Sequence, residues 1–359
     1  MNECHPIPPP KWWAEAVARW KDMPLPNLKK LMLDSAYACA DKHCAPLELA
    51  FTTFFSNAHI DALTFKHLQD SCLVERPDFT PFHAKPKKLH LLITTWSYEP
   101  SPDNDIELRH RHKLFNIDLN TYWLATMQTQ LTHLTLHCNT YWGIYPRWQP
   151  GDLHFPHLKS LALGKWTIAF DWQIDFITSH SQTLEQLILT SCPILHALRM
   201  TPRQINNQWQ LRLPGTCRGK PYTENWFCNL RWHTVLSTFR TSLTKLKHFS
   251  MGRGPVGTFD FCLRVYHYDE AFEDRYQLRP CIDSSRYAVF DFEYGPAEWL
   301  EYDPERRQRI YEKTDGYDGS CWLDRETDPE VRKMLEYPNC LREDQEALDD
   351  LLVTLRDRW

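Results

Sequence analysis

A six-residue pattern of leucines, Leu-x-x-Leu-x-Leu, constrains this chain more than any other feature. Clear copies begin at residues 28, 131, 158 and 184, and looser copies begin at residues 60, 86 and 246. Alternating apolar residues are typical of a strand with one buried face. Three of the six spacings are 26 or 27 residues, which falls in the range of about 20–29 residues for leucine-rich repeats. Two copies extend the match with a ninth residue of the expected type, at Asn139 and Cys192.

The segments between these motifs have helical patterns. They cover residues 47–57, 120–130, 171–181 and 229–242, each with apolar residues spaced three or four apart. Three of them begin with Asn or Asp, which favour the first position of a helix. A strand and a helix in each repeat predict an α/β fold, an irregular leucine-rich-repeat solenoid over residues 24–253.

The two ends differ from this body. Residues 1–23 carry Trp13, Val17 and Trp20 on one helical face, which predicts an N-terminal capping helix. Residues 254–359 lose the repeat and are strongly acidic, whereas residues 1–250 have a small excess of Lys and Arg. Strand patterns cover residues 258–268 and 286–294, and helical patterns cover residues 303–313, 329–336 and 343–358. This region is predicted to be a mixed α+β C-terminal cap.

The residues between the leucines of each strand are expected to face outward and to form a concave surface for a protein partner. This predicted binding face consists of Lys30, Met32, Ala62, Thr64, His133, Thr135, Ser160, Ala162, Gln186, Ile188, His248 and Ser250. A few residues usually dominate such an interface, and we expect His133, Gln186 and Ile188 to do so because they lie near the centre of the array.

Several segments resemble a fungal protein family. They are the leucine motifs, residues 191–195 (SCPIL), residues 231–239 leading to residues 246–249, and the block Tyr287–Asp291 followed by Gly295–Trp299. Together they resemble the F-box proteins of filamentous fungi with a leucine-rich-repeat body, over roughly residues 24–359. The resemblance implies a substrate receptor of a cullin-RING ubiquitin ligase, with the ligase adaptor as a further partner. Residues 1–23 are too short for an F-box, so only target binding carries over to residues of this chain.

Motifs for chemistry are weaker. The stretch Gly252–Gly257 matches Gly-x-Gly-x-x-Gly, but Pro255 and a strand pattern follow where a nucleotide site needs a helix. Carboxylates occur at Asp291, Glu293 and Glu298, as a hydrolase would need. His133 and His137 would share a metal on a helix but not on the predicted strand. The basic run at residues 109–113 suits an acidic partner or a phosphate, although a solvated surface segment is the simpler interpretation.

The sequence therefore predicts a protein-interaction module and not an enzyme. No cofactor, metal, membrane or nucleic acid is expected as a ligand. The 12 cysteines are scattered without a Cys-x-x-Cys pair and no secretory signal precedes them, which predicts reduced thiols in the cytoplasm or nucleus. The alternatives are a stand-alone leucine-rich-repeat scaffold, or a hydrolase or nucleotide binder that uses the C-terminal region. The target itself has no signature in the sequence.

Overall fold

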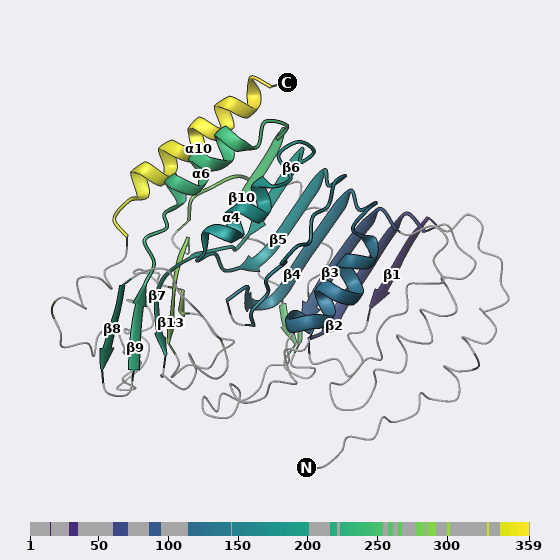
Figure 1. Cartoon of the computed structure of the whole chain (residues 1–359), viewed down its shortest axis with the longest axis horizontal. Helices are drawn as coiled ribbons and strands as arrows, with labels where there is room; N and C mark the ends of the chain where they lie inside the picture. The colour runs from purple at the N-terminus through teal and green to yellow at the C-terminus, as the bar shows by residue number, and fades with distance from the viewer. Residues whose placement is uncertain are drawn as a thin grey trace, which may run out of the picture.

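A computed structural model of the chain has a parallel β-sheet at its centre. It describes residues 15, 29–34, 60–70, 86–94, 114–144, 146–200, 216–220, 223–253, 258–260, 265–267, 278–283, 286–291, 300–301, 329 and 338–358. The sheet has seven strands in the order β1-β2-β3-β4-β5-β6-β10, and all of them run parallel (Figure 1). The strands are β1 (Lys30–Asp34), β2 (Ala62–Gln69), β3 (Lys88–Thr94), β4 (His133–Trp142), β5 (Ser160–Trp166), β6 (Gln186–Thr190) and β10 (His248–Gly252).

The leucine motifs set the register of this sheet. The fourth residue of each motif pairs with its counterpart on the next strand, along the row Leu31, Leu63, Leu89, Leu134, Leu161, Leu187 and Phe249. From Leu63 onward, each of these side chains is at most 4% exposed. A shift by one residue would turn the whole row toward the other face, so burial of the leucines fixes the pairing.

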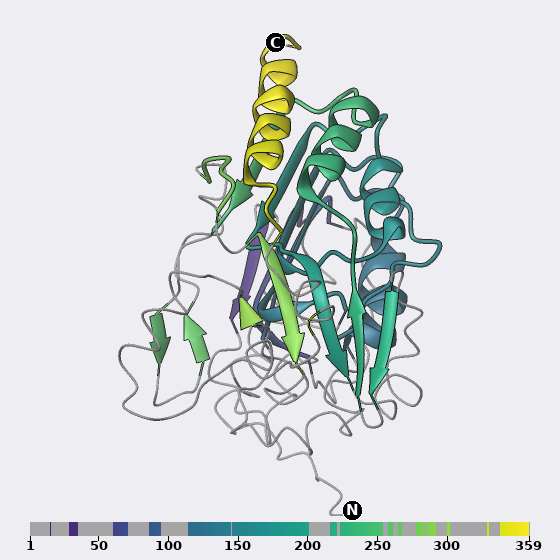
Figure 2. The same ribbon diagram turned by 90° about the vertical axis from the view of Figure 1, so that its left-hand side faces the viewer.

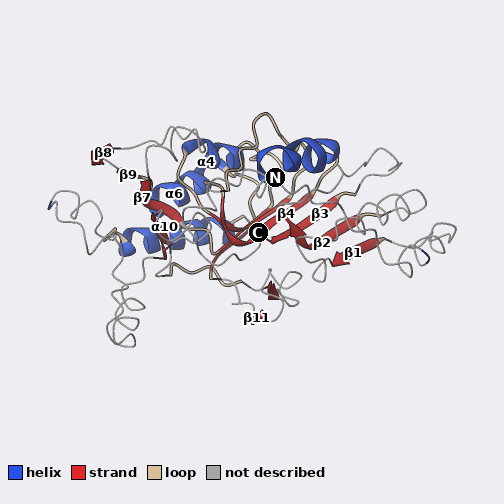
Figure 3. Ribbon diagram, turned by 90° about the horizontal axis from the view of Figure 1, so that it is seen from below, coloured by secondary structure: helices blue, strands red, loops and turns tan. Residues whose placement is uncertain are grey.

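Helices cover the face on which these leucines lie. They are η1 (Leu114–Leu124, a π-helix), η2 (Ala125–Met127, a 3₁₀ turn), α4 (Asp171–Thr178) and α6 (Trp232–Ser242), and their apolar residues join the core of the sheet. Figure 3 shows α4 and α6 on one side of the sheet. The C-terminal helix α10 (Leu341–Arg356) packs beside α6 and buries Leu348, Leu351 and Leu355 in the same core (Figure 1).

A second sheet follows the first. Its order is β14-β13-β7-β9-β8, in which β13 runs parallel to β7 and the remaining pairs are antiparallel (Figure 2). These strands are β14 (Leu300–Glu301), β13 (Tyr287–Asp291), β7 (Ile194–Met200), β9 (Thr223–Phe227) and β8 (Thr216–Lys220). A separate antiparallel pair consists of β11 (Thr258–Asp260) and β12 (Val265–His267).

This architecture corrects the expected fold class. The described residues form an α/β arrangement around one all-parallel sheet with few helices, and the predicted leucine-rich-repeat solenoid is wrong. A solenoid repeats one supersecondary unit, whereas the connections here differ from one another. A π-helix precedes β4, an α-helix precedes β6, and three strands of the second sheet lie between β6 and β10. The descriptions that depended on the solenoid, namely leucine-rich repeat, F-box-like and ubiquitin ligase receptor, have no support in this structure.

The predictions of individual elements were more accurate than the prediction of the fold class. The helices over residues 171–181, 229–242 and 343–358 are confirmed as α4, α6 and α10, and the two C-terminal strand regions contain β11, β12 and β13. The predicted Asp cap is wrong, because Asp171 is already inside α4. The Gln173 side chain instead accepts the N–H groups of Ala169 and Phe170. The predictions for residues 1–23, 47–57, 303–313 and 329–336 lie outside the described residues, apart from residues 15 and 329.

Three tryptophans fill the core beside β4 and β5. Trp142, Trp148 and Trp166 are fully buried, with ring centroids 5.5–6.2 Å apart. The indole N–H of Trp142 donates to Gly164 O at 2.7 Å, and that of Trp148 donates to Asn120 Oδ1 at 2.7 Å, so these two rings also satisfy their polar groups. Within the described part of the chain, no helix has the length and apolar character needed to cross a bilayer.

Candidate functional site

The face of the sheet opposite the helices carries a groove of about 660 Å³. It lies over the amino-terminal ends of β4, β5, β6 and β10, and the last turns of α10 form one wall. We call it the basic groove. Its lining consists of His133, Lys159, Ser160, Glu185, Gln186, Lys247, His248, Phe249, Ser250, Pro280, Leu352, Leu355 and Arg356.

Strand pairing brings the polar residues of the basic groove together from distant parts of the sequence. The first residues of the four strands, His133, Ser160, Gln186 and His248, are direct register partners. The residues just before these strands form a second row through backbone hydrogen bonds. In that row Glu185 N donates to Lys159 O, and Lys247 N donates to Glu185 O, both at 2.8 Å.

Cations outnumber anions in the basic groove. Glu185 lies between two lysines, with its carboxylate oxygens 3.4 Å from Lys159 Nζ and 3.0 Å from Lys247 Nζ. The hydrogen bond from Lys247 holds the pKa of Glu185 below its usual value. Arg356 adds a further exposed cation from α10. One fixed carboxylate therefore faces three permanently charged cations.

His133 is a half-buried residue on β4, the outermost of the four strands that form the basic groove. Burial lowers the pKa of its imidazole, and the neighbouring charges of Lys88 and Lys159 lower that pKa further. Its Nδ1 lies 2.9 Å from Thr132 Oγ1. The imidazole is therefore neutral at neutral pH, and an incoming anion would favour its protonated form.

The predicted binding face divides into two rows in the structure. One row holds the first strand residues, and the other holds the residues two positions later, from Met32 to Ser250. Five of the twelve line the basic groove: His133, Ser160, Gln186, His248 and Ser250. Lys30 and Met32 are exposed at the other end of the sheet, with Ala62 and Thr64 half-buried beside them. Thr135, Ala162 and Ile188 are only 3–4% exposed, so Ile188 is unavailable as the surface contact that its central position suggested.

Sequence reasoning missed the charged row and the wall of α10. Lys159, Glu185 and Lys247 occupy the second position of their leucine motifs, which alternation would turn toward the helices. At the very end of the sheet these side chains are exposed or half-buried instead. A signal was available, because this position is charged in six of the seven motifs: Lys29, Asp61, Lys87, Lys159, Glu185 and Lys247.

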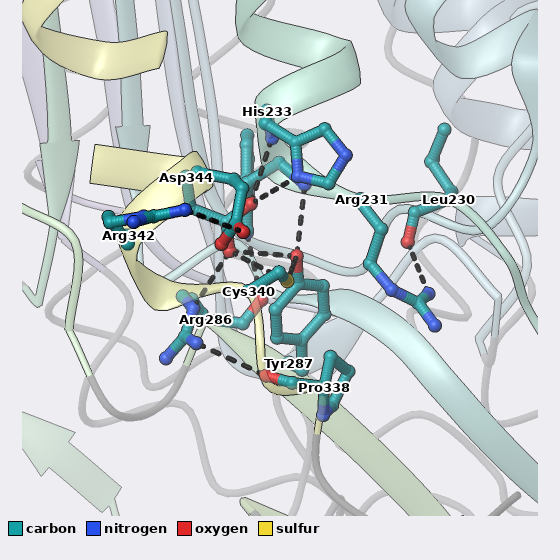
Figure 4. Close-up of polar contacts among 11 residues, drawn as sticks. Leu230, Arg231, His233, Arg286, Tyr287, Pro338, Cys340, Arg342 and Asp344 are labelled. Atoms are coloured by element: carbon teal, nitrogen blue, oxygen red, sulfur yellow. Dashed lines mark hydrogen bonds and ion pairs between the residues drawn. The ribbon is translucent and has the colours of Figure 1, made fainter. Parts of the chain in front are cut away.

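A second polar cluster is buried where α6, β13 and α10 meet, and Figure 4 shows its contacts. At its centre is the fully buried Asp344. Its Oδ1 accepts the His233 N–H at 2.9 Å and lies 3.0 Å from His233 Nδ1. Its Oδ2 accepts Arg286 Nε at 3.0 Å, the Tyr287 hydroxyl at 2.9 Å and, more weakly, Cys340 Sγ at 3.4 Å. We call this group the Asp344 cluster.

Three members of this cluster have the atoms of a metal site. The nearest ligand atoms of His233, Cys340 and Asp344 lie within 4.8 Å of one another. The buried Arg286 guanidinium already supplies the positive charge that the carboxylate needs, and both carboxylate oxygens are occupied by donors. Burial also raises the pKa values of the Tyr287 hydroxyl and the Cys340 thiol, which keeps both groups protonated as donors. The arrangement is that of a structural tie between three elements.

The other chemical motifs do not assemble into a site among the described residues. His133 and His137 both lie on β4, as predicted, so the helical spacing for a shared metal does not occur. Gly252 ends β10 with a φ of +140°, and residues 254–257 of that motif lie outside the described residues. Asp291 ends β13, but its side chain is not described, and Glu293, Glu298 and residues 109–113 also lie outside the described residues.

No protein-family model, curated protein or solved structure matches this chain significantly.

Proposed function

We propose that this chain is a protein-interaction module that holds a segment of its partner in the basic groove. The observation that carries the proposal is the combination of a rigid sheet floor, fixed charged and amide groups, and an apolar wall from Leu352 and Pro280. Binding sites in proteins combine a few positioned polar groups with apolar surface in this way.

Binding without catalysis fits the hydrogen bonds of the groove. The Ser160 hydroxyl donates to Gln186 Oε1 at 2.6 Å, and an amide oxygen is no general base. The nearby histidine, His133, has its Nδ1 beside Thr132 Oγ1. The Ser160 hydroxyl is therefore paired with an amide and not with a base, and we propose a non-enzymatic role that needs no cofactor.

The cysteines support a reducing compartment, and we propose the cytoplasm or nucleus. Cys138, Cys192 and Cys228 are buried free thiols, and Cys281 and Cys340 are also free. Burial raises the pKa of Cys138 to about 12, so this thiol stays protonated and unreactive. Free buried thiols are typical of proteins that fold under reducing conditions.

Blocking the groove tests the proposed function. Ser250→Trp places an indole on the groove floor, because Ser250 is the half-buried middle residue of β10 and lines the groove. Tagged wild-type and variant chains are expressed in the native cells, crosslinked, purified and compared by quantitative mass spectrometry. We expect one protein to crosslink to the wild-type chain in stoichiometric amount. The recovered amount of this protein should fall at least about tenfold with the variant, as for a substitution at the centre of an interface.

Thr241→Trp is the matched control, because Thr241 is exposed on α6, on the opposite side of the sheet. It should keep the partner. Equal recovery from both variants, with unchanged melting temperatures, would contradict the proposal and favour a scaffold without a dedicated groove ligand. A cullin and its adaptor among the recovered proteins would support the role implied by the family resemblance, which stays a prediction.

A further inference from the structure

Charged residues run beyond the basic groove along the whole amino-terminal end of the seven-stranded sheet. The residue before each strand is linked to its neighbour by a backbone hydrogen bond, which gives one continuous row. The row consists of Lys29, Asp61, Lys87, Thr132, Lys159, Glu185 and Lys247. Every second position is a lysine, and each of these lysines is exposed. Lys30 and Lys88 add two exposed cations in the next row, so the edge carries a clear positive excess.

The spacing of these lysines is set by the sheet. Neighbouring strands lie about 4.8 Å apart, so lysines on alternate strands recur about every 9.6 Å. A polyproline II segment has three residues per turn and rises about 3.1 Å per residue, so its every third residue lies on one face at intervals of about 9.3 Å. The two periods agree closely enough for three successive contacts to stay in register.

We propose, on the basis of the proposed function above, that the partner of the basic groove is an extended acidic segment that crosses the strands. An acidic residue at every third position faces Lys87, Lys159 and Lys247 in turn. The six strand steps from Lys29 to Lys247 span about 29 Å, which corresponds to nine or ten residues of such a segment. The backbone of a polyproline II segment makes no internal hydrogen bonds and is solvated by water. The segment therefore needs no partner strand.

The walls of the groove favour a peptide over a nucleic acid. Leu352 and Pro280 offer apolar contacts at the end where Lys247 lies. Single-stranded nucleic acids are held by exposed aromatic rings that stack on the bases. Among the residues that line the groove, Phe249 is the one Phe, Tyr or Trp. Its ring is only 4% exposed and packs in the core, so it is not available to stack on a base.

Glu185 has a defined role in this proposal. It occupies the gap between Lys159 and Lys247 and hydrogen-bonds to the latter, so it competes with an acidic ligand for both ammonium groups. Replacing it with a neutral isostere would free both lysines. The proposal therefore predicts opposite effects for two kinds of substitution within one row, which general damage to the groove would not produce.

The test uses the full chain and fluorescein-labelled peptides in an anisotropy titration. The main probe has three Glu-Pro-Pro repeats, and a second probe has the same composition with its glutamates consecutive. We expect the repeat probe to bind at least about fivefold more tightly, and the double change Lys159→Gln/Lys247→Gln to weaken it about tenfold or more, given the modest strength of each surface ion pair. Glu185→Gln should strengthen binding about threefold, and added salt should weaken it.

Lys245→Gln is the matched control, since Lys245 is exposed near Lys247 but does not line the groove. It should leave the affinity unchanged. Equal binding of both glutamate probes, equal losses for Lys245→Gln and the double variant, or tighter binding of a thymidine oligonucleotide would each overturn the inference. The two proposals can fail separately. If Ser250→Trp removes a partner but the peptide affinities do not change in the Lys159→Gln/Lys247→Gln variant, the proposed function stands and the acidic ligand is excluded.

Discussion

The Asp344 cluster and the basic groove use charge in opposite ways at the two ends of α10. In the cluster, a carboxylate with no exposure is matched by donors from α6, β13 and α10 itself. In the groove, Glu185 leaves part of the charge of its lysine neighbours uncompensated at the surface. A fully matched buried cluster fixes structure, whereas an unbalanced exposed row is available to a ligand.

The two regions are also mechanically connected through α10. Asp344 fixes the first turn of this helix, and the Arg358 guanidinium, just past its last turn, donates to the Leu243, Leu246 and Arg240 carbonyls at the end of α6. Leu352, Leu355 and Arg356 on the same helix then form the groove wall. Loss of the cluster should therefore reach the groove, while changes in the groove should not reach the cluster.

The largest effect is expected from Asp344→Ala. It leaves the buried Arg286 guanidinium without its carboxylate, and breaking a buried ion pair in this way costs about 3–5 kcal/mol of folding free energy. Urea unfolding followed by tryptophan fluorescence measures the loss. Asp350→Ala on the same helix is the control, because the Arg240–Asp350 pair is exposed and worth less than about 1 kcal/mol. Similar losses for both variants would remove the distinction between the two kinds of site.

A buried group without a counter-charge should give the next largest effect. His180 stacks on His154 at 4.9 Å, accepts the Phe155 N–H through Nε2 and lies with Nδ1 2.8 Å from Phe176 O. Burial lowers the pKa of its imidazole to about 4, from an ordinary value of 6.5. As the pH falls through 6.5, the unfolded chain binds a proton that the folded chain does not. Stability should then fall by up to about 3 kcal/mol between pH 6.5 and pH 4 and change no further below that from this group.

The measurement is the urea unfolding free energy at several pH values for wild type and His180→Gln. The glutamine retains an amide donor for Phe176 O but cannot be protonated. We expect its stability to depend less on pH across this window. An identical slope in both proteins would show that the buried imidazole is not the source, and that carboxylates dominate the acid response.

An intermediate effect is expected from Tyr287→Phe. The hydroxyl donates to Asp344 Oδ2 at 2.9 Å and accepts the Trp232 N–H at 3.1 Å. Its removal leaves that buried N–H without this acceptor, at a cost of about 1–3 kcal/mol. The loss should be non-additive with Asp344→Ala in a double-mutant cycle, because both side chains belong to one network. Additive losses would mean that the two groups act independently.

The sequence predicted the strands and their partners better than the class of fold. The leucines report which residues face the core, and that information sufficed to place Leu134, Leu161 and Leu187 side by side in register. They carry no information about what connects the strands. The 62-residue gap between the last two motifs holds three strands of a second sheet, and the 45-residue gap before β4 holds a π-helix, so equal motifs did not mean equal repeats.

The functional clusters were harder to predict for a related reason. The charged row of the groove takes the residue just before each strand, so Lys159 and Lys247 become neighbours of Glu185 only when β5, β6 and β10 pair. The Asp344 cluster joins residues 58 and 111 positions apart, on elements of different type. No local periodicity links such residues. They meet because burying a carboxylate requires donors from whichever elements pack around it.

The smallest effect should come from Lys159→Gln. This side chain is 59% exposed, so its loss should change stability by less than about 1 kcal/mol. The measurable change should be at His133, whose pKa is lowered by burial first and by Lys88 and Lys159 second. Removing one cation should raise the imidazole pKa, as followed by NMR titration of the ring protons. The pKa should stay below 6.5, because burial is the larger cause and Lys88 remains.

This last change sets the exposed region directly against the buried one. A surface charge acts on its neighbours without being needed for folding, whereas the buried carboxylate of Asp344 is needed for folding because it accepts hydrogen bonds from His233, Arg286 and Tyr287. Lys245→Gln serves as the comparison, and it should leave the pKa of His133 where it is, since Lys245 is not among the charges that act on this imidazole. A loss of stability as large as that of Tyr287→Phe, or an unmoved His133 titration, would show that Lys159 is part of the structural framework and not of a surface prepared for an acidic ligand.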